Sequence, residues 1–245
     1  MKNRLTIIIP TLNNLEGIRY LSRYFRDKDY DLVVVDNSKK NRGFAGGVNY
    51  GARNAKTKWL LILNDDIEFK DETTLDELVK EAEKRKLDAV SPLVRNPNGK
   101  IENYGYRVLP YGKVELVKEI PKRVRDDGFG IDGLTAACLL IKTSVFKKLR
   151  GFDERFFAYL EDVDFFLRFK KTGYKMGLST VTVKHNHLTT AKTMGNFKAR
   201  QDMVNWWRLY FKHKEKFTFD FKFLIERLRN ISGYIKATFS NFFSI

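Results

Sequence analysis

The sequence predicts an α/β protein with a Rossmann-like, mostly parallel central sheet flanked by helices. Apolar runs at 5–9, 31–35 and 59–63 each end in polar or acidic residues, as do strands that are buried on both faces. Segments with helical spacing of apolar residues separate these runs, and an order of strand, helix and strand favours parallel pairing. With 245 residues and 43% hydrophobic content, the chain can bury a sizeable core.

The first part of the chain alternates predicted strands and helices. Asn13 or Asn14 can cap the first helix, and Asp71 suits the cap of the third. The strands are expected at 5–9, 31–38, 59–63 and 88–94. The helices are expected at about 18–25 and 73–86, with another that the segment 41–51 opens and that runs to about 54.

The second part begins with an alternating stretch that predicts a hairpin or meander, and therefore a small antiparallel sheet. We expect this stretch at 101–117, a mobile surface loop at 118–128, strands at 136–141, 174–178 and 180–183, and helices from about 143, 161 and 196. The tail from 217 is basic and aromatic. We therefore expect one domain over 1–215 and a C-terminal helical tail over 216–245.

Composition limits the class of protein. The only cysteine, Cys138, lies in an apolar run and suits a core position in a protein of the reducing cytosol. The apolar run at the start is short and halted by Pro10, unlike a signal peptide, and no run is long enough for a transmembrane helix. The formal net charge of +16 predicts an anionic partner such as nucleic acid, acidic lipid or a phosphorylated substrate.

The predicted strand at 59–63 ends in Asn64, Asp65 and Asp66. Ligands of open α/β sheets bind beyond the carboxyl ends of strands. Adjacent carboxylates repel one another, and a divalent cation carrying a diphosphate would compensate them. From this stretch alone, the alternative to a cation site is an ordinary turn in which an Asp caps the helix that follows.

The segment 41–51 is rich in glycine and opens a helix. Glycine allows the backbone to approach a ligand closely, and the free N–H groups of a first helical turn favour phosphate. The segment contains neither the P-loop pattern nor the dinucleotide fingerprint, and such turns also serve plain packing.

Two later clusters also carry chemistry. Glu161, Asp162 and Asp164 crowd the start of a predicted helix, which the helix dipole alone would favour, but three acids beside aromatic residues indicate a site. His185 and His187 follow a predicted strand and can complete a cation site with carboxylates. A structural role for these histidines is the alternative.

The basic, aromatic tail has two interpretations. An amphipathic helix of this composition can lie in a membrane interface. It can equally pack its aromatic residues on the domain or on a second subunit as a homodimer.

The order of these segments resembles the family-2 glycosyltransferases of the GT-A fold, especially the rhamnosyltransferase-like branch that builds cell-surface polysaccharides. The matching stretches are I-I-I-P-T-L-N-N, V-V-V-D-N-S, N-R-G-F-A-G-G-V-N-Y-G, L-L-I-L-N-D-D, G-F-D-E-R-F-F-A-Y-L-E-D-V-D-F-F-L-R and V-K-H, which together cover about residues 5–211.

The resemblance implies a site for a nucleotide-diphosphate sugar with dTDP, UDP or GDP as the nucleotide. The residues that would bind this donor are Pro10, Thr11, Asn13, Asp36, Asn37, Asn41, Arg42, Gly43, Phe44, Ala45, Gly46, Asn49, Asn64 and Asp65.

The resemblance also implies a metal site and a catalytic base. Asn64-Asp65-Asp66 is similar to the family's D-x-D motif with Asn in place of the first acid, so Asp66 would bind Mg²⁺ or Mn²⁺ together with His185. The replacement implies a weak or exchangeable metal, and a metal-independent variant is the alternative. Glu161-Asp162 is similar to the family's E-D pair, with Asp162 as the catalytic base of an inverting transfer.

The implied function is transfer of a sugar, with rhamnose as one candidate, to a glycan or lipid-linked acceptor in cell-envelope polysaccharide synthesis. The enzyme would be cytoplasmic or peripheral on the anionic inner face of the membrane. The expected acceptor-side residues are Asp132, Gly133, Asp164, His187 and Trp206.

Two rival functions fit less well. A sugar-nucleotidyltransferase should show a G-x-G-T-R-like loop after the first strand, where this chain has P-T-L-N-N. A nucleic-acid-binding protein would explain the charge and the aromatic residues, but not the acids at separate strand and helix ends. We therefore expect no nucleic-acid partner.

Overall fold

A computed structural model describes residues 5–119, 130–186 and 196–242. Its centre is an eight-stranded sheet in the order β2-β1-β3-β9-β5-β10-β4, with β6 paired to β5 beside this path. The strands of the sheet are β1 (Leu5–Thr11), β2 (Asp31–Asp36), β3 (Trp59–Leu63), β4 (Ile67–Phe69), β5 (Ala89–Arg95), β6 (Ile101–Asn103), β9 (Cys138–Lys142) and β10 (Met176–His185). A separate antiparallel pair consists of β7 (Tyr106–Leu109) and β8 (Lys113–Leu116).

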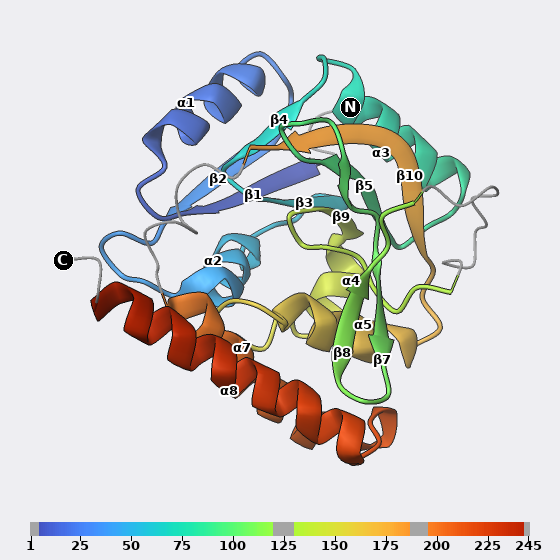
Figure 1. Cartoon of the computed structure of the whole chain (residues 1–245). Helices are drawn as coiled ribbons and strands as arrows, with labels where there is room; N and C mark the ends of the chain where they lie inside the picture. Colours follow the sequence, from blue (N-terminus) through green and yellow to red (C-terminus); the bar gives the residue numbers. More distant parts are fainter. Residues whose placement is uncertain (1–4, 120–129, 187–195, 243–245) are drawn as a thin grey trace.

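Helices cover both faces of this sheet (Figure 1), so the predicted α/β architecture is confirmed. One face packs against α1 (Leu15–Tyr24) and α3 (Thr74–Lys84), and the other against α2 (Gly43–Ala52), α4 (Thr143–Lys148) and α5 (Glu161–Lys170). The remaining helices are α7 (Phe197–Lys212), α8 (Phe221–Phe242) and the 3₁₀ turns η1 (Glu154–Phe156) and η2 (Lys214–Lys216).

The predicted parallel pairing of the first strands is confirmed. β1 lies between β2 and β3 and pairs in parallel with both. Parallel strands present their carboxyl ends at one edge of a sheet. The residues that follow β1, β2 and β3 therefore share this edge.

The predicted cap of α1 by Asn14 is present, whereas the N-cap residue of α3 is Thr73 and Asp71 lies two residues before it. Asn14 Oδ1 accepts the backbone N–H of Gly17 at the start of α1, at 3.0 Å. Asp71 Oδ1 accepts the N–H groups of Thr73 and Thr74 before α3, at 3.0 and 3.1 Å. Both side chains satisfy donors that the first helical turn leaves unpaired.

Three features of the sheet differ from the expectations. The predicted strand at 136–141 is β9, which enters between β3 and β5 and is antiparallel to both. The short strand β4 was not predicted. The prediction of two strands at 174–178 and 180–183 was wrong, because they form the single strand β10, whose register with β5 shifts between Leu178 and Thr182.

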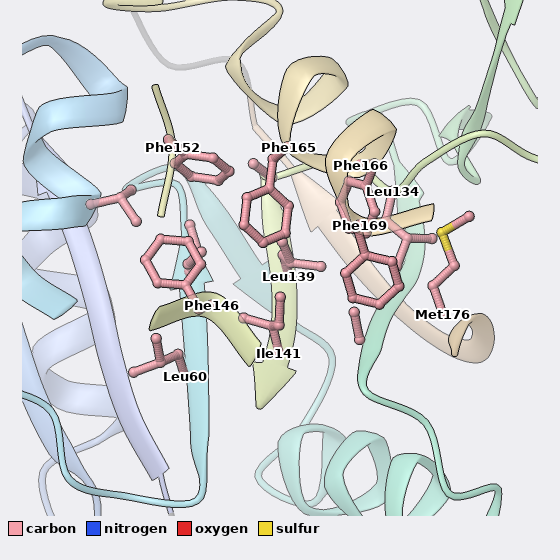
Figure 2. Packing of buried hydrophobic residues seen from close by; sticks show 14 of the residues in the cluster. Leu60, Leu134, Leu139, Ile141, Phe146, Phe152, Phe165, Phe166, Phe169 and Met176 are labelled. Atoms are coloured by element: carbon pink, nitrogen blue, oxygen red, sulfur yellow. The ribbon is translucent and has the colours of Figure 1, made fainter. Parts of the chain in front are cut away.

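Aromatic packing positions α5 on the sheet (Figure 2). Phe165, Phe166 and Phe169 are fully buried and belong to the same core cluster as Leu139 and Ile141 of β9. Burying each of these side chains contributes about 1.5–3 kcal/mol. This packing fixes the first turn of α5 near the sheet edge described above.

The C-terminal helices pack on the rest of the chain through their own aromatic residues. The ring of Phe223 in α8 is fully buried, 5.8 Å from Trp207 and 4.9 Å from Tyr210 of α7. The predicted packing of the tail on its own domain therefore occurs along this face of α8. No helix in the described ranges is long and apolar enough to cross a membrane.

Cys138 is fully buried, as predicted, and burial raises the pKa of its thiol far above the usual range. Most of the predicted loop at 118–128 lies outside the described residues, as does His187.

Candidate functional site

A cavity of about 460 Å³ lies at the carboxyl edge of β1, β2 and β3 and extends to the first turns of α5 and α7. Many of the predicted site residues line it, although they come from distant parts of the chain. They are Pro10, Asn37, Asn41, Gly43, Phe44, Asn64, Asp65, Asp66, Glu161, Asp162 and His185.

Gly43 shows why glycine is needed at this edge. Its φ is +67°, and a Cβ atom there would lie 2.4 Å from the carbonyl oxygen of Phe157. That same oxygen accepts the N–H of Ala45 at 3.0 Å. The glycine therefore lets the start of α2 dock against the segment that precedes α5.

Other predicted donor residues support the cavity from outside its lining. Thr11 Oγ1 donates to Asp65 Oδ2 at 2.5 Å. Asn49 bonds to the backbone of Phe152, with Nδ2 donating to its carbonyl oxygen at 2.8 Å. The first contact joins the end of β1 to the residues after β3, and the second joins α2 to the segment before η1.

The remaining predicted donor residues also lie outside the lining. Asp36 is exposed and accepts the N–H of Ser38 at 2.8 Å. The guanidinium of Arg42 lies 4.4 Å from the centre of the Tyr50 ring. Asn13 has a φ of +65° in the turn after β1. Ala45 and Gly46 are buried in α2.

None of the four described residues that were predicted for the acceptor side lines the cavity. Asp132 pairs with Lys170 at 2.7 Å and with Lys216 at 3.3 Å. A Cβ atom on Gly133 would lie 2.2 Å from the Tyr106 hydroxyl. Trp206 is buried in the cluster beneath α7.

Asp164 points into the protein interior, away from the cavity, and is fully buried. It pairs with Arg168 at 2.9 Å, with Lys212 at 2.7 Å and with His213 at 2.9 Å. These partners hold its carboxylate ionised, with a pKa below the usual value although burial alone would raise it. The contacts connect α5 with the end of α7.

One corner of the cavity places Asp66 beside His185. The antiparallel pairing of β10 with β4 brings these residues together, and the N–H of Asn186 donates to the carbonyl oxygen of Asp66 at 2.9 Å. His185 Nε2 lies 3.0 Å from Asp66 Oδ1, and Nδ1 lies 3.1 Å from Glu102 Oε1. Burial lowers the pKa of His185, but the carboxylates of Asp66 and Glu102 outweigh it and raise the pKa to about 9.

This corner fits a divalent cation that also binds a substrate. Asp66 Oδ1 is buried without a well-aligned hydrogen bond in spite of its short distance to His185. The Asp66 carboxylate and the His185 imidazole are both ligand types for Mn²⁺. Glu102, at the Nδ1 atom of His185, would orient the imidazole ring. Within the described ranges no three acidic, histidine or cysteine side chains form a metal site by themselves, so a bound substrate would have to supply ligands.

Asp65 also lines the cavity, and its side chain contacts the end of β1. Besides Thr11 at its side chain, its carbonyl oxygen accepts Asn14 Nδ2 at 3.1 Å. Burial raises the pKa of its carboxyl group, and the hydrogen bonds from Thr11 and Asn14 oppose this rise.

The acid pair lies at the start of α5. Asp162 accepts the N–H groups of Val163 at 2.8 Å and Ala136 at 3.4 Å, and burial raises its pKa to about 6. Burial and the neighbouring Asp162 raise the pKa of Glu161 well above the usual value. With a pKa of about 6, Asp162 is ionised at neutral pH and can accept a proton, whereas the raised pKa of Glu161 favours its protonated form.

The backbone before this pair is strained. Phe157, Tyr159 and Leu160 have φ values of 61°, 67° and 66°, a region that non-glycine residues seldom adopt and that is concentrated at functional sites. Asn205 of α7 is fully buried, and its amide donates to the carbonyl oxygens of Phe156, Ala158 and Tyr159 at 2.9, 2.9 and 2.7 Å.

We expect Asn205→Leu to lower the free energy of unfolding by about 2–4 kcal/mol, because buried carbonyl groups lose their donor. Urea denaturation measures this change. Asn54→Ala, at an exposed position after α2, is the control and should stay within about 0.5 kcal/mol. An equally small effect of Asn205→Leu would show that the strained segment does not depend on this amide.

Several residues that line the cavity were not predicted from the sequence. Among them are Glu102, Asn103, Tyr106, Thr135, Tyr159, Lys198 and Asp202. They lie on β6, β7, α7 and the connecting segments, where the local pattern contains no sign of a site. The Tyr106 hydroxyl and Glu161 Oε2 are buried without a hydrogen-bond partner in the described structure, as expected of groups that meet a ligand or water.

Several known proteins have sequences similar to this chain. The chain is 30% identical over 152 residues to the O-antigen biosynthesis protein RfbC of Myxococcus xanthus, a match that covers 59% of this chain and 12% of that protein. It is 28% identical over 131 residues to the N-acetylglucosaminyl-diphospho-decaprenol L-rhamnosyltransferase of Mycobacterium tuberculosis, covering 47% of this chain and 42% of that protein. These matches thus span less than half of each relative. The rhamnosyltransferase WbbL of Escherichia coli is 26% identical over 65% of this chain and 64% of its own length.

Solved structures confirm the GT-A fold. GalNAc-T7 with UDP, GalNAc and Mn²⁺ superposes with a TM-score of 0.62 at 15% identity, covering 85% of this chain and 48% of that one. The mannosyltransferase PcManGT of Pyrobaculum calidifontis, in complex with GDP-Man and Mn²⁺, gives a TM-score of 0.60 at 15% identity over 100% of this chain and 76% of that one. The family model for glycosyl transferase family 2 matches residues 16–150. The chain therefore belongs to glycosyl transferase family 2.

Proposed function

We propose that this protein is an inverting glycosyltransferase that transfers a sugar from a nucleotide-diphosphate sugar to a hydroxyl group of a glycan or lipid-linked acceptor. One observation carries the proposal: a single cavity joins Asp66 and His185 at one corner to the Glu161–Asp162 pair at the start of α5. A binding site for a diphosphate–cation complex and a group able to accept a proton are the two parts that this reaction needs.

The donor would lie along the edge of β1, β2 and β3, with its diphosphate toward Asp66 and His185. GalNAc-T7 and PcManGT were solved with UDP or GDP-Man and with Mn²⁺, which supports a donor and a divalent cation of these kinds here. Asp66 would hold Mg²⁺ or Mn²⁺ together with His185, whose imidazole must release a proton on binding the metal. The bound cation would supply positive charge to the departing diphosphate. The donor would be a dTDP-, UDP- or GDP-sugar, and rhamnose is supported by the names of relatives.

Asp162 would be the catalytic base. As the acceptor oxygen attacks the anomeric carbon, its proton passes to the Asp162 carboxylate and the bond from that carbon to the diphosphate oxygen breaks. A single displacement of this kind inverts the anomeric configuration. Burial and the neighbouring Asp162 raise the pKa of Glu161 well above its usual value, so Asp162 is the more readily ionised of the two acids.

The names of relatives support the proposed acceptor and setting. A relative whose name includes a diphospho-decaprenol supports a lipid-linked acceptor and a role in cell-envelope polysaccharide synthesis. The single buried thiol of Cys138 suits the cytoplasm. We assign the transferase domain to 1–215 and the tail that follows it to 216–245.

Donor binding can be tested by a thermal-shift screen of dTDP-, UDP- and GDP-sugars with and without Mn²⁺. A ligand at a hundred times its Kd stabilises the folded state by about 2.7 kcal/mol, which raises Tm by about 5–10 °C for a chain of this size. We expect such a shift for one nucleotide class, with Mn²⁺ increasing it. If no sugar nucleotide changed Tm with or without the metal, the proposed donor site would be wrong.

A further inference from the structure

Helix α8 is anchored to the protein along one face only. Phe223 is fully buried and Arg227 nearly so. The Arg227 guanidinium lies 4.3 Å from the centre of the Trp206 ring, and its Nη2 donates to the carbonyl oxygen of Gly112 at 2.5 Å. These contacts determine which side of the helix turns outward.

The outward side carries an apolar stripe. Its residues follow one another at intervals of three or four, which places them on one side of a helix. Phe221 is 75% exposed and Leu228 63% exposed. The stripe consists of Phe221, Leu224, Leu228, Ile231, Ile235 and Phe239, all of which are exposed. Exposed apolar surface this continuous marks an interaction site.

A basic row borders this stripe. Lys222, Arg229 and Lys236 recur every seven residues, nearly two helical turns, and are exposed. Glu226, which pairs with Arg229 at 2.5 Å, is the only acidic residue in α8. An apolar stripe beside lysine and arginine is the pattern of helices that lie in a membrane interface, where long basic side chains reach the headgroups.

Charge decides between the two partners that such a stripe could have. A second copy of this chain brings the same formal net charge of +16 and adds like charge beside the basic row. Acidic lipid brings the opposite charge, and each basic side chain near it adds to the attraction.

The end of α8 lies close to the candidate site. Asn196 Nδ2, just before α7, donates to Thr238 Oγ1 of α8 at 3.2 Å. The next residues of α7, Phe197 and Lys198, line the cavity. Figure 1 shows α8 running along α7 on the outside of the molecule. A surface bound to the outer face of α8 would therefore lie beside the rim of the cavity.

We propose that the outer face of α8 docks the protein on an anionic lipid bilayer. The apolar stripe enters the interface and the basic row contacts lipid headgroups. The proposal deepens the proposed function, since a lipid-linked acceptor would then be held beside the cavity, but lipid binding can be measured without any transfer assay.

Co-sedimentation of the full chain with vesicles tests this surface. We expect at least about tenfold tighter binding to vesicles of phosphatidylcholine and phosphatidylglycerol than to phosphatidylcholine alone, with affinity falling as salt rises. The double variant Leu228→Gln, Ile235→Gln should lose about tenfold or more in affinity for the anionic vesicles. The matched control is Leu15→Gln, at a 69% exposed position on α1, which should bind like the unchanged chain.

A thermal-shift measurement with the sugar nucleotide that gives the largest shift in the donor screen checks that each variant still folds and binds donor. Loss of vesicle binding with an unchanged donor response supports the α8 surface. Equal binding of the double variant and the unchanged chain would overturn it, and so would equal binding to both kinds of vesicle. The outer face of α8 would instead be assigned to a second copy of the chain by two results together. The unchanged chain would form a dimer that does not bind vesicles, and the double variant would be a monomer. Failure of every sugar nucleotide to bind would contradict the proposed donor site and leave the lipid result standing.

Discussion

Asp162→Asn should lower the rate of sugar transfer by about 10²- to 10⁴-fold, the usual contribution of a general base. The substitution keeps the shape of the side chain and an oxygen that can accept the N–H of Val163. It removes the ability to accept a proton. Single-turnover transfer measures the chemical step, and the thermal shift with donor should remain unchanged, because Asp162 is not assigned to the donor.

The pH profile of the unchanged protein tests the same residue. Burial raises the pKa of Asp162 to about 6, and the base must be ionised to act. The value of kcat/KM should therefore fall about tenfold per pH unit below about 6 and level off above it. Gln resembles the protonated form that the raised pKa of Glu161 favours, so Glu161→Gln should lower the transfer rate much less than Asp162→Asn. Near-normal transfer by Asp162→Asn would refute the assignment of the base.

Asp66→Ala should weaken Mn²⁺ binding by more than about 100-fold. Loss of a residue that only orients a metal ligand costs 10- to 100-fold in affinity, and Asp66 is the proposed ligand itself. His185 would remain, still oriented by Glu102 at 3.1 Å, but without its carboxylate partner. Titration of Mn²⁺ in the presence of the nucleoside diphosphate, followed by electron paramagnetic resonance of the free ion, measures the affinity directly.

Glu68→Ala is the matched control for Asp66→Ala. Glu68 lies two residues on, in β4, where its side chain is 41% exposed and pairs with Lys184 at 3.1 Å. Glu68→Ala removes one negative charge, as Asp66→Ala does, but from a residue that does not line the cavity. Mn²⁺ affinity should stay within about twofold, since an exposed charge at this distance is screened. Equal losses for both variants would mean that local charge, and not ligation by Asp66, determines metal binding.

The sequence alone determined the parts of this protein that depend on local periodicity. Apolar runs such as 59–63 are strands because they can be buried on both faces, and helical spacing predicted α1, α3 and α5. Parallel order then implied that Asn64, Asp65 and Asp66 follow a strand at the ligand-binding edge. The resemblance in motif order predicted the family that the comparison confirmed.

Tertiary structure decided which of those residues meet and how they ionise. The antiparallel pairing of β10 with β4 sets His185 3.0 Å from Asp66, and no local pattern contains the direction or register of such a pairing. Glu102 contacts His185, which is 83 positions away in the sequence. Asn205 binds carbonyl groups that are 46–49 positions away.

The same reason explains the acids of α5. Asp162 and Asp164 are two residues apart and chemically alike, yet the pKa of Asp162 is raised by burial while ion pairs lower that of Asp164. Burial and charged partners come from distant segments packed in space, so the local pattern could identify the acids but not their opposite pKa shifts, and only the family resemblance singled out Asp162 as the base.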